Sequence, residues 1–177
     1  MRVSQVYTAA PSEERCAVEM ETFALLDRLG IPYTWVAHDV ANTIEDCAAV
    51  DAALGISICK NLFLCNRQKT EFYLLAMPGD KLFQTKELSR QLGTARLSFA
   101  PPERMEELLG CAPGSASVLG MAYDKSHQVH LLMDREVYES EWFGCHPCKS
   151  DATLRIQTRD LLNIFFPYTG HPVTVVD

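Results

Sequence analysis

The sequence has no apolar run that approaches the roughly 20 residues of a membrane-spanning helix. Its first residues show no apolar segment behind the charged start, so we expect no signal peptide. Neither glycine-rich phosphate-binding pattern occurs, GxGxxG or GxxxxGKS/T, so nothing supports a nucleotide cradled by such a loop. Internal repeats and low-complexity segments are also missing. These absences favour one globular domain over residues 1–177, with no membrane partner.

Cationic side chains are in deficit, with 16 Lys and Arg against 23 Asp and Glu, which gives a formal net charge of −7. Broad, non-specific binding of nucleic acid needs a basic face, and this charge argues against it. The net charge of −7 is compatible with a partner that contacts the protein at one small basic site. Such a site could lie in the middle third of the chain, although a solvated mixed-charge surface explains the same residues equally well: Arg67, Lys69, Lys81, Lys86, Arg90 and Arg96.

The seven cysteines are an odd number at irregular spacing, which predicts reduced thiols and a cytoplasmic location. Cys145 and Cys148 form a CxxC motif, but a thioredoxin-like pair needs its first cysteine at a helix N-terminus. Here the motif leads into residues 149–154, which we interpret as a turn followed by a strand. A zinc site would need a second ligand pair at suitable spacing, and no other CxxC occurs. We therefore expect no metal and no cofactor, and we keep a thiol-redox pair as an alternative.

The pattern of apolar residues predicts a mixed α/β fold of the α+β type. Strands are expected at residues 33–38, 59–64, 72–77, 96–100, 118–123, 128–133, 152–156 and 173–176. Helices are expected from a cap at Ser12 to Gly30, at 43–55 with Thr43 as cap, at 80–92 with Thr85 as cap, and at 101–110. A short helical piece is expected within 134–141. The last helix should begin with Thr158 as cap and end near Phe166, where Pro167 breaks it. Because some strands come in hairpin-like pairs, we expect a largely antiparallel mixed sheet of about seven strands with helices packed on it.

Two stretches combine polar side chains with apolar runs. Lys60 and Asn61 open a run that is followed, after a polar turn, by the second strand of a mostly buried pair. A lysine beside such a core either extends into solvent or meets an anion. Far along the chain, residues 144–153 contain His146-Pro147 followed by Asp-Ala-Thr. We expect these two stretches to form halves of one pocket. No serine, histidine and aspartate stand out as a catalytic triad.

Five short motifs recur in this order in one protein family: Lys60-Asn61 at a strand start, residues 97–103 (LSFAPPE), Pro113-Gly114-Ser115, Asp134-Arg135-Glu136, and His146-Pro147 with Asp151-Ala152-Thr153. In these motifs the chain resembles the YbaK/ProX family of aminoacyl-tRNA deacylases, kin of the editing insertion domain of bacterial prolyl-tRNA synthetase. The resemblance runs from about Ser12 to the end of the printed sequence. Within the family, the free-standing alanyl-tRNA(Pro) deacylases are the most similar.

The resemblance implies a YbaK/ProX editing-domain fold and a metal-independent hydrolase that acts in trans on the ester of mischarged Ala-tRNA(Pro). Its implied partner is the 3′ CCA end and acceptor stem of an aminoacyl-tRNA, with prolyl-tRNA synthetase as a second candidate. Lys60 would meet the negative charge of the tRNA end or of an oxyanion, Asn61 would hold the aminoacyl group, and His146 would orient the substrate or a water. The substrate-binding residues would be Gly114, Ser115, Ala116, Ser117, Val118 and Phe99.

The loop that starts at Gly114 departs from the family pattern. The family commonly has a proline four residues after this glycine, where this chain has Val118. A non-proline residue has more freedom in φ, so we expect real but imperfect rejection of larger amino acids by this loop. Three alternatives stay open: a deacylase for serine or cysteine on tRNA, a non-catalytic tRNA-binding regulatory module of the same fold, and the thiol-redox protein.

Overall fold

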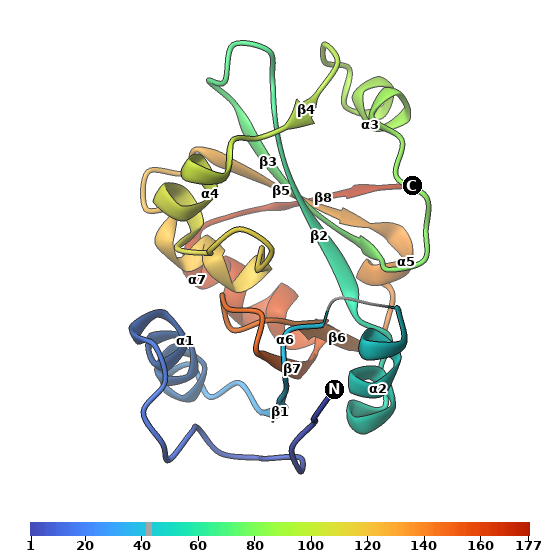
Figure 1. Cartoon of the computed structure of the whole chain (residues 1–177). Helices are drawn as coiled ribbons and strands as arrows, with labels where there is room; N and C mark the ends of the chain where they lie inside the picture. Colours follow the sequence, from blue (N-terminus) through green and yellow to red (C-terminus); the bar gives the residue numbers. More distant parts are fainter. Residues whose placement is uncertain (42–43) are drawn as a thin grey trace.

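The computed structural model describes residues 1–41 and 44–177, and the strands of this part form two sheets (Figure 1). The smaller sheet has the order β1-β7-β6, with β1 Tyr33–Ala37, β6 Trp142–Cys145 and β7 Ala152–Gln157, and it is antiparallel throughout. The larger sheet has the order β4-β2-β3-β5-β8, with β2 Cys59–Cys65, β3 Phe72–Pro78, β4 Ser98–Phe99, β5 Val129–Asp134 and β8 Val173–Val176.

Pairing in the larger sheet is mixed. β2 is antiparallel to β3 and to β4, whereas β3 with β5 and β5 with β8 run parallel. The predicted α+β class with a largely antiparallel mixed arrangement of strands is therefore confirmed, although the strands divide into two sheets where one was expected. The described residues contain eight strands, three in one sheet and five in the other.

Nine helical segments of the described part surround these sheets: α1 Ala17–Arg28, α2 Ile44–Leu54, α3 Thr85–Leu92, α4 Pro102–Leu109, the 3₁₀ segment η1 Val118–Tyr123, α5 Arg135–Tyr138, α6 Thr158–Asp160, the π segment η2 Leu161–Phe165 and α7 Phe166–Thr169. Several boundaries follow local rules. Pro102 stands in the first turn of α4, and Gly93 and Gly110 end α3 and α4 with φ of +63° and +64°.

Other expected boundaries are wrong. The first helix begins at Ala17 after an N-cap at Cys16, and Ser12 lies in irregular chain before it. α3 and α6 begin at Thr85 and Thr158, so these threonines do not cap them from outside. Residues 118–123 form the 3₁₀ segment instead of a strand, and β6 was not expected at all. The expected cap at Thr43 lies outside the described residues.

The C-terminal helical stretch passes Pro167 and ends only at Gly170, whose φ is +75°. The expected break near Phe166 is therefore wrong. In the π segment the N–H of Phe166 donates to the carbonyl of Leu161, five residues back. Pro167 then falls in the first turn of α7, where a missing N–H costs little.

The core lies on both faces of the larger sheet. Successive residues of β3 alternate between two buried clusters: Phe72, Leu74 and Ala76 belong to one, and Tyr73, Leu75 and Met77 to the other. The first cluster also takes in residues of the smaller sheet, α1, α4 and η1, whereas the second includes Leu88 of α3. The predicted strand pair β2–β3 is thus central, and its mostly buried character is confirmed.

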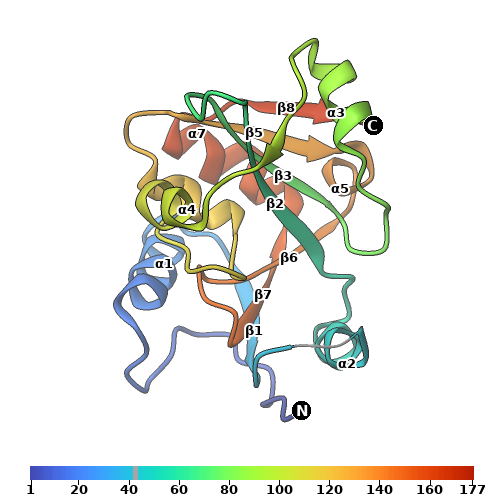
Figure 2. The same cartoon turned by 45° about the horizontal axis from the view of Figure 1, so that its top comes forward.

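The start of β2 is where the two sheets meet. Figures 1 and 2 show this end of β2 beside α2 and β6, whereas β4 pairs with the other end of β2. Gly144 of β6 permits the close approach, because a Cβ there would stand 2.5 Å from Ile56 Cδ1 and 3.5 Å from Ile58 Cα. The junction places the first residues of β2 opposite the turn that follows β6.

Candidate active site

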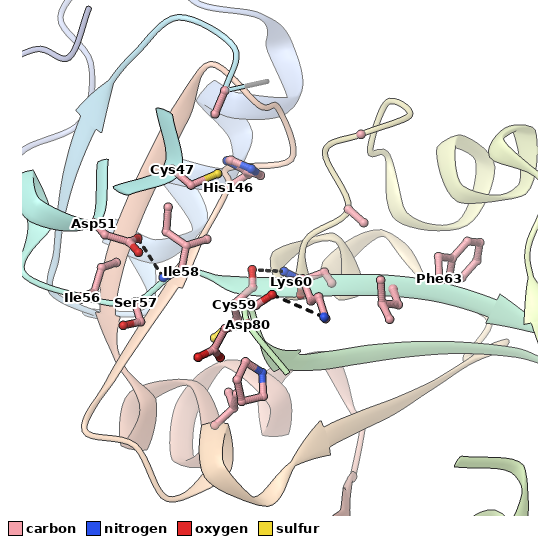
Figure 3. A pocket seen from close by; sticks show the side chains of 18 of the residues that line it. Cys47, Asp51, Ile56, Ser57, Ile58, Cys59, Lys60, Phe63, Asp80 and His146 are labelled. Atoms are coloured by element: carbon pink, nitrogen blue, oxygen red, sulfur yellow. Dashed lines mark hydrogen bonds between the residues drawn. The ribbon is translucent and has the colours of Figure 1, made fainter. Parts of the chain in front are cut away.

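A cleft of about 1270 Å³ lies at this junction, and Figure 3 shows it from close by. The start of β2, α2, the loop after α4 and the turn after β6 all contribute to its lining. It brings together six residues of the predicted site: Lys60, Asn61, Phe99, Gly114, Ala116 and His146. The two stretches singled out in the sequence therefore do line one cavity.

Lys60 reaches across the cleft wall to the segment between β3 and α3. Its Nζ lies 3.4 Å from the carbonyl oxygen of Gly79 and also donates to the carbonyl oxygen of Lys81. An ammonium group has three N–H donors, so two of them are directed at the protein's own backbone and one remains for a ligand. This arrangement fixes a cation in the wall of the cleft without neutralising its charge.

Asn61 follows on β2 and carries an unused acceptor. Its Nδ2 lies 3.5 Å from the carbonyl oxygen of Cys59, a long contact, and its Oδ1 is buried with no hydrogen-bond partner among the described residues. A buried amide oxygen without a partner is uncommon because it has lost its water without replacement. A ligand N–H or O–H that enters the cleft would supply the missing donor.

His146 presents one ring nitrogen as an acceptor. Its Nδ1–H donates to the carbonyl oxygen of Ala152 at 2.7 Å, which leaves the lone pair on Nε2. Burial lowers the pKa of His146 below its ordinary value, and nearby His38 acts in the same direction, whereas the Ala152 carbonyl opposes both. The imidazole is therefore neutral near pH 7, and Nε2 can accept a hydrogen bond or a proton.

The support behind His146 was not visible in the sequence. Ser117 Oγ donates to the carbonyl oxygen of His146 at 2.6 Å. Thr153 Oγ1 lies 3.4 Å from His146 Nδ1 and 2.8 Å from His38 Nε2. The Nδ1–H of His38 donates to the carbonyl oxygen of Asp39 at 2.8 Å, so in a neutral ring Nε2 accepts from the Thr153 hydroxyl. This chain of bonds restrains both the backbone and the ring of His146.

The loop after α4 divides between the cleft and the core. Gly114, with a φ of +84°, and Ala116 face the cleft. Ser115 and Ser117 are buried, and the Ser115 hydroxyl lies 2.7 Å from the carbonyl oxygen of Ala112 and 3.2 Å from that of Cys148. Val118 is fully buried at the start of η1. Ser115, Ser117 and Val118 therefore anchor the loop to the core, and Gly114 and Ala116 form its part of the cleft wall.

Among the described residues, three acidic ones line the cleft: Glu136, which belongs to the Asp134-Arg135-Glu136 motif, and two that were missed, Asp51 and Asp80. Asp51 of α2 accepts a hydrogen bond from the backbone N–H of Ile58 at 2.9 Å; burial raises its pKa, and that bond opposes the rise. Asp80, just beyond β3, is exposed at the rim. Neither residue stands in a motif, and only the packing of α2 and of the β3–α3 segment brings them to the cleft. The exposed Cys47 of α2 lines it as well, and Figure 3 shows it on the same side as His146.

The CxxC cysteines are part of the core. Cys145 and Cys148 are each 1% exposed, and both thiols are free. Burial raises the pKa of Cys145, and a contact with Cys111 together with burial raises that of Cys148. Cys148 has a φ of +65° in the turn that leads to β7, so the expected turn and strand are confirmed. A redox-active cysteine needs an accessible thiol with a lowered pKa, and these two have the opposite properties.

In residues 1–41 and 44–177, no helix is long and apolar enough to cross a membrane. Among the same residues, no group of three or more His, Cys, Asp or Glu side chains is placed to hold a metal ion.

The chain is similar to known proteins over most of its length. The family described as aminoacyl-tRNA editing domain matches residues 38–164. The prolyl-tRNA editing protein ProX of Acetoanaerobium sticklandii is 31% identical over 141 residues, which cover 80% of this chain and 86% of the relative. Prolyl-tRNA synthetase associated domain-containing protein 1 of Danio rerio is 30% identical over 176 residues, 98% of this chain and 94% of the relative.

The fold has solved counterparts. The crystal structure of a proposed trans-editing enzyme for prolyl tRNA synthetase superposes with a TM-score of 0.67 at 18% identity, covering 92% of this chain and 98% of that one. At this level of identity the likeness shows the fold.

Proposed function

The chain belongs to the aminoacyl-tRNA editing domain family, and on this premise we propose that it is a trans-editing deacylase that hydrolyses the ester of mischarged Ala-tRNA(Pro). The names of its relatives concern prolyl-tRNA editing and association with prolyl-tRNA synthetase. The observation that carries the proposal is the convergence of Lys60, Asn61 and His146, from β2 and from the turn after β6, on one cleft.

The reaction adds water across the ester between the amino acid and the terminal ribose. Oxygen attacks the carbonyl carbon, negative charge develops on the carbonyl oxygen, and the bond to the ribose oxygen breaks with a proton returned to that oxygen. Lys60 stabilises the developing oxyanion or the adjacent phosphate through its remaining N–H. Asn61 Oδ1 accepts from the α-amino group of the substrate, which supplies the donor that this buried oxygen lacks.

His146 holds the attacking water or a ribose hydroxyl through its Nε2. The neutral ring can accept this hydrogen bond at pH 7 because burial disfavours its protonated form. A hydroxyl of the terminal ribose assists the attack, as the family resemblance implies. Protein side chains and the substrate fill every role, so the proposed reaction needs no metal ion and should proceed in the presence of a chelator.

Substrate choice follows from size. Pro113, Gly114 and Ala116 line the cleft, and in this proposal they form the wall that admits a methyl side chain and refuses a larger one. A site that admits alanine and refuses the proline ring complements a synthetase that cannot exclude the smaller amino acid, which is double-sieve editing. The proposed partners are the 3′ CCA end and acceptor stem of tRNA and prolyl-tRNA synthetase, in the cytoplasm.

A deacylation panel tests the proposal. Purified protein is mixed with Ala-, Ser-, Cys- and Pro-tRNA(Pro), and the rate of ester loss is compared with that of buffer and of the Lys60→Met variant. We expect rapid hydrolysis of Ala-tRNA(Pro), slow hydrolysis of Ser-tRNA(Pro) and no hydrolysis of Pro-tRNA(Pro). Faster hydrolysis of Ser-tRNA(Pro) or Cys-tRNA(Pro) would assign the enzyme to that amino acid instead of alanine. If all four aminoacyl-tRNAs lose their ester only as fast as in buffer, while the protein still binds tRNA, the chain is a tRNA-binding module and not an enzyme.

A further inference from the structure

The exposed ring of Phe99 stands at the end of the cleft away from His146, in contact with the half-buried ring of Phe83. Phe99 of β4 is 63% exposed and lines the cleft, and its ring meets that of Phe83 edge-on, with centroids 5.9 Å apart. The neighbouring Leu82 is 78% exposed. Side chains of this size are usually buried, so the exposure of Phe99 in the lining of a cleft, with exposed Leu82 nearby in the chain, points to a ligand. We refer to Phe83 and Phe99 as the aromatic platform.

The backbone under the platform is held firmly. β4 is the edge strand next to β2, with Phe99 paired to Leu64, and the N–H of Ala100 donates to the carbonyl oxygen of Phe63 at 2.9 Å. The same strand β2 carries Lys60 and, three residues on, Phe63, which also lines the cleft. Figure 3 shows Lys60 and Phe63 in turn along β2, leading away from His146. The platform is thus fixed at one end of the cleft and the proposed reaction centre at the other.

The segment that carries the platform is cationic in an acidic protein. Residues 79–100 contain four Lys and Arg against two Asp and Glu, although the whole chain has a net charge of −7. Arg90 pairs with Glu87, and Lys81 pairs with Asp134 at 2.8 Å. The remaining two are exposed and have no ion pair in the described part of the chain: Lys86, three residues after Phe83, and Arg96, three residues before Phe99.

We infer that the aromatic platform stacks against a base of the single-stranded 3′ end of tRNA, while Lys86 and Arg96 contact its phosphates. Exposed aromatic rings flanked by cations are the means by which proteins hold single strands, because every base has a π-face and every nucleotide a charge. This assignment rests on the proposed function, which puts the terminal ribose near Lys60 and His146. The preceding nucleotides would then leave along β2 toward β4.

The charge decides between occupants of this surface. An apolar partner protein gains nothing from two unpaired cations, and a second copy that paired through this same surface would bring like charges together. A polyanion with flat apolar bases matches both features. Stacking tolerates different bases, so the platform would add affinity for the strand and leave recognition of the amino acid to the other end of the cleft.

The test compares Phe99→Leu with Phe99→Trp, using Tyr168→Leu as the control. Leucine removes the π-face, tryptophan keeps it, and Tyr168 is a 47% exposed aromatic on α7 that does not line the cleft. Two readouts are the KM and kcat for Ala-tRNA(Pro), and the Kd of a short RNA ending in CCA, followed by fluorescence of a 2-aminopurine near its 3′ end. Stacked 2-aminopurine is quenched, so the probe reports contact with the ring.

We expect Phe99→Leu to raise both the KM and the RNA Kd about tenfold, the scale of losing one stacked base, with a smaller change in kcat. Phe99→Trp should restore binding and quenching, and Tyr168→Leu should match the wild type. Replacing Lys86 and Arg96 by Gln should weaken binding and flatten its dependence on salt.

An unchanged Kd for Phe99→Leu, or equal loss with leucine and tryptophan, would refute the stacking. So would a dimer at working concentration that dissociates in Phe99→Leu, since a second copy would then cover the platform. These outcomes are separable from the fate of the proposed function. A wild type that deacylates while Phe99→Leu binds normally overturns only the platform. A wild type without deacylase activity whose RNA binding depends on Phe99 overturns only the reaction.

Discussion

Replacing Lys60 by methionine removes the positive charge from the described lining of the cleft and keeps an unbranched side chain of similar length. The folded state loses two contacts, from Nζ to the carbonyl oxygens of Gly79 and Lys81. Both contacts are partly open to solvent, so we expect the free energy of unfolding to fall by only about 1 kcal/mol. The β3–α3 segment should keep its place, because it also packs against the residue before β2: a Cβ on Gly79 would stand 2.8 Å from the carbonyl oxygen of Ile58.

The effect on catalysis should be much larger. Loss of one positioned donor to a developing oxyanion typically costs about 10²-fold in rate, or roughly 2.7 kcal/mol of transition-state stabilisation. The assay is single-turnover hydrolysis of Ala-tRNA(Pro) with enzyme in excess, combined with urea unfolding of the same preparations. Lys125→Met is the matched control: this lysine is exposed in the turn after η1 and has no ion pair among the described residues. Lys125→Met should change neither the hydrolysis rate nor the free energy of unfolding.

The contrast between the two measurements decides the role of Lys60. A Lys60→Met rate within about threefold of wild type would remove the ammonium from the reaction. A rate loss that tracks a large drop in unfolding free energy would assign Lys60 to the fold instead. Lys60→Arg should recover part of the rate, because arginine keeps the positive charge. Recovery should be incomplete because a planar guanidinium would replace the ammonium that now donates to the Gly79 and Lys81 carbonyls.

Four further predictions concern the walls of the cleft and the core behind them. Burial lowers the pKa of His146 below 6.5, so the unfolded chain takes up the proton first as the pH falls. The free energy of unfolding, measured with urea, should therefore decline from about pH 7.5 through 6.5. His146→Gln should flatten that decline. Ser117→Ala should lower the free energy of unfolding by about 1–3 kcal/mol and also reduce kcat/KM, because the carbonyl of His146 loses its buried donor; an unchanged kcat/KM would show that the bond does not position His146. Replacing Cys145 and Cys148 by Ser should lower the melting temperature but leave turnover per folded molecule nearly intact, with or without chelator, whereas a reversible disulfide that gates turnover would revive the redox alternative. Gly114→Val should reduce hydrolysis of Ala-tRNA(Pro) at least about tenfold, because a β-branched residue is strained at a φ of +84°; full activity would move the size sieve elsewhere.

Local signals in the sequence determined much of the fold and pointed to the cleft. The strand pair β2–β3 follows from two apolar runs around a polar turn, and the ends of α3 and α4 follow from Gly93 and Gly110. These features depend on residues within a few positions of one another, so a linear reading can find them. The family resemblance joined Lys60 and Asn61 to His146, and the structure brings all three to one cleft.

The tertiary structure alone decided how that cleft is built. Whether the strands make one sheet or two depends on which edges meet across the chain, and no local pattern encodes this. Ser117 and His146 are 29 residues apart in the sequence, and their hydrogen bond has no counterpart in spacing or composition. Val118 enters the core because η1 turns it inward, and Pro167 is tolerated because a π turn precedes it. Propensity acts over a few residues, whereas buried contacts and unpaired polar groups are settled only when distant segments pack together.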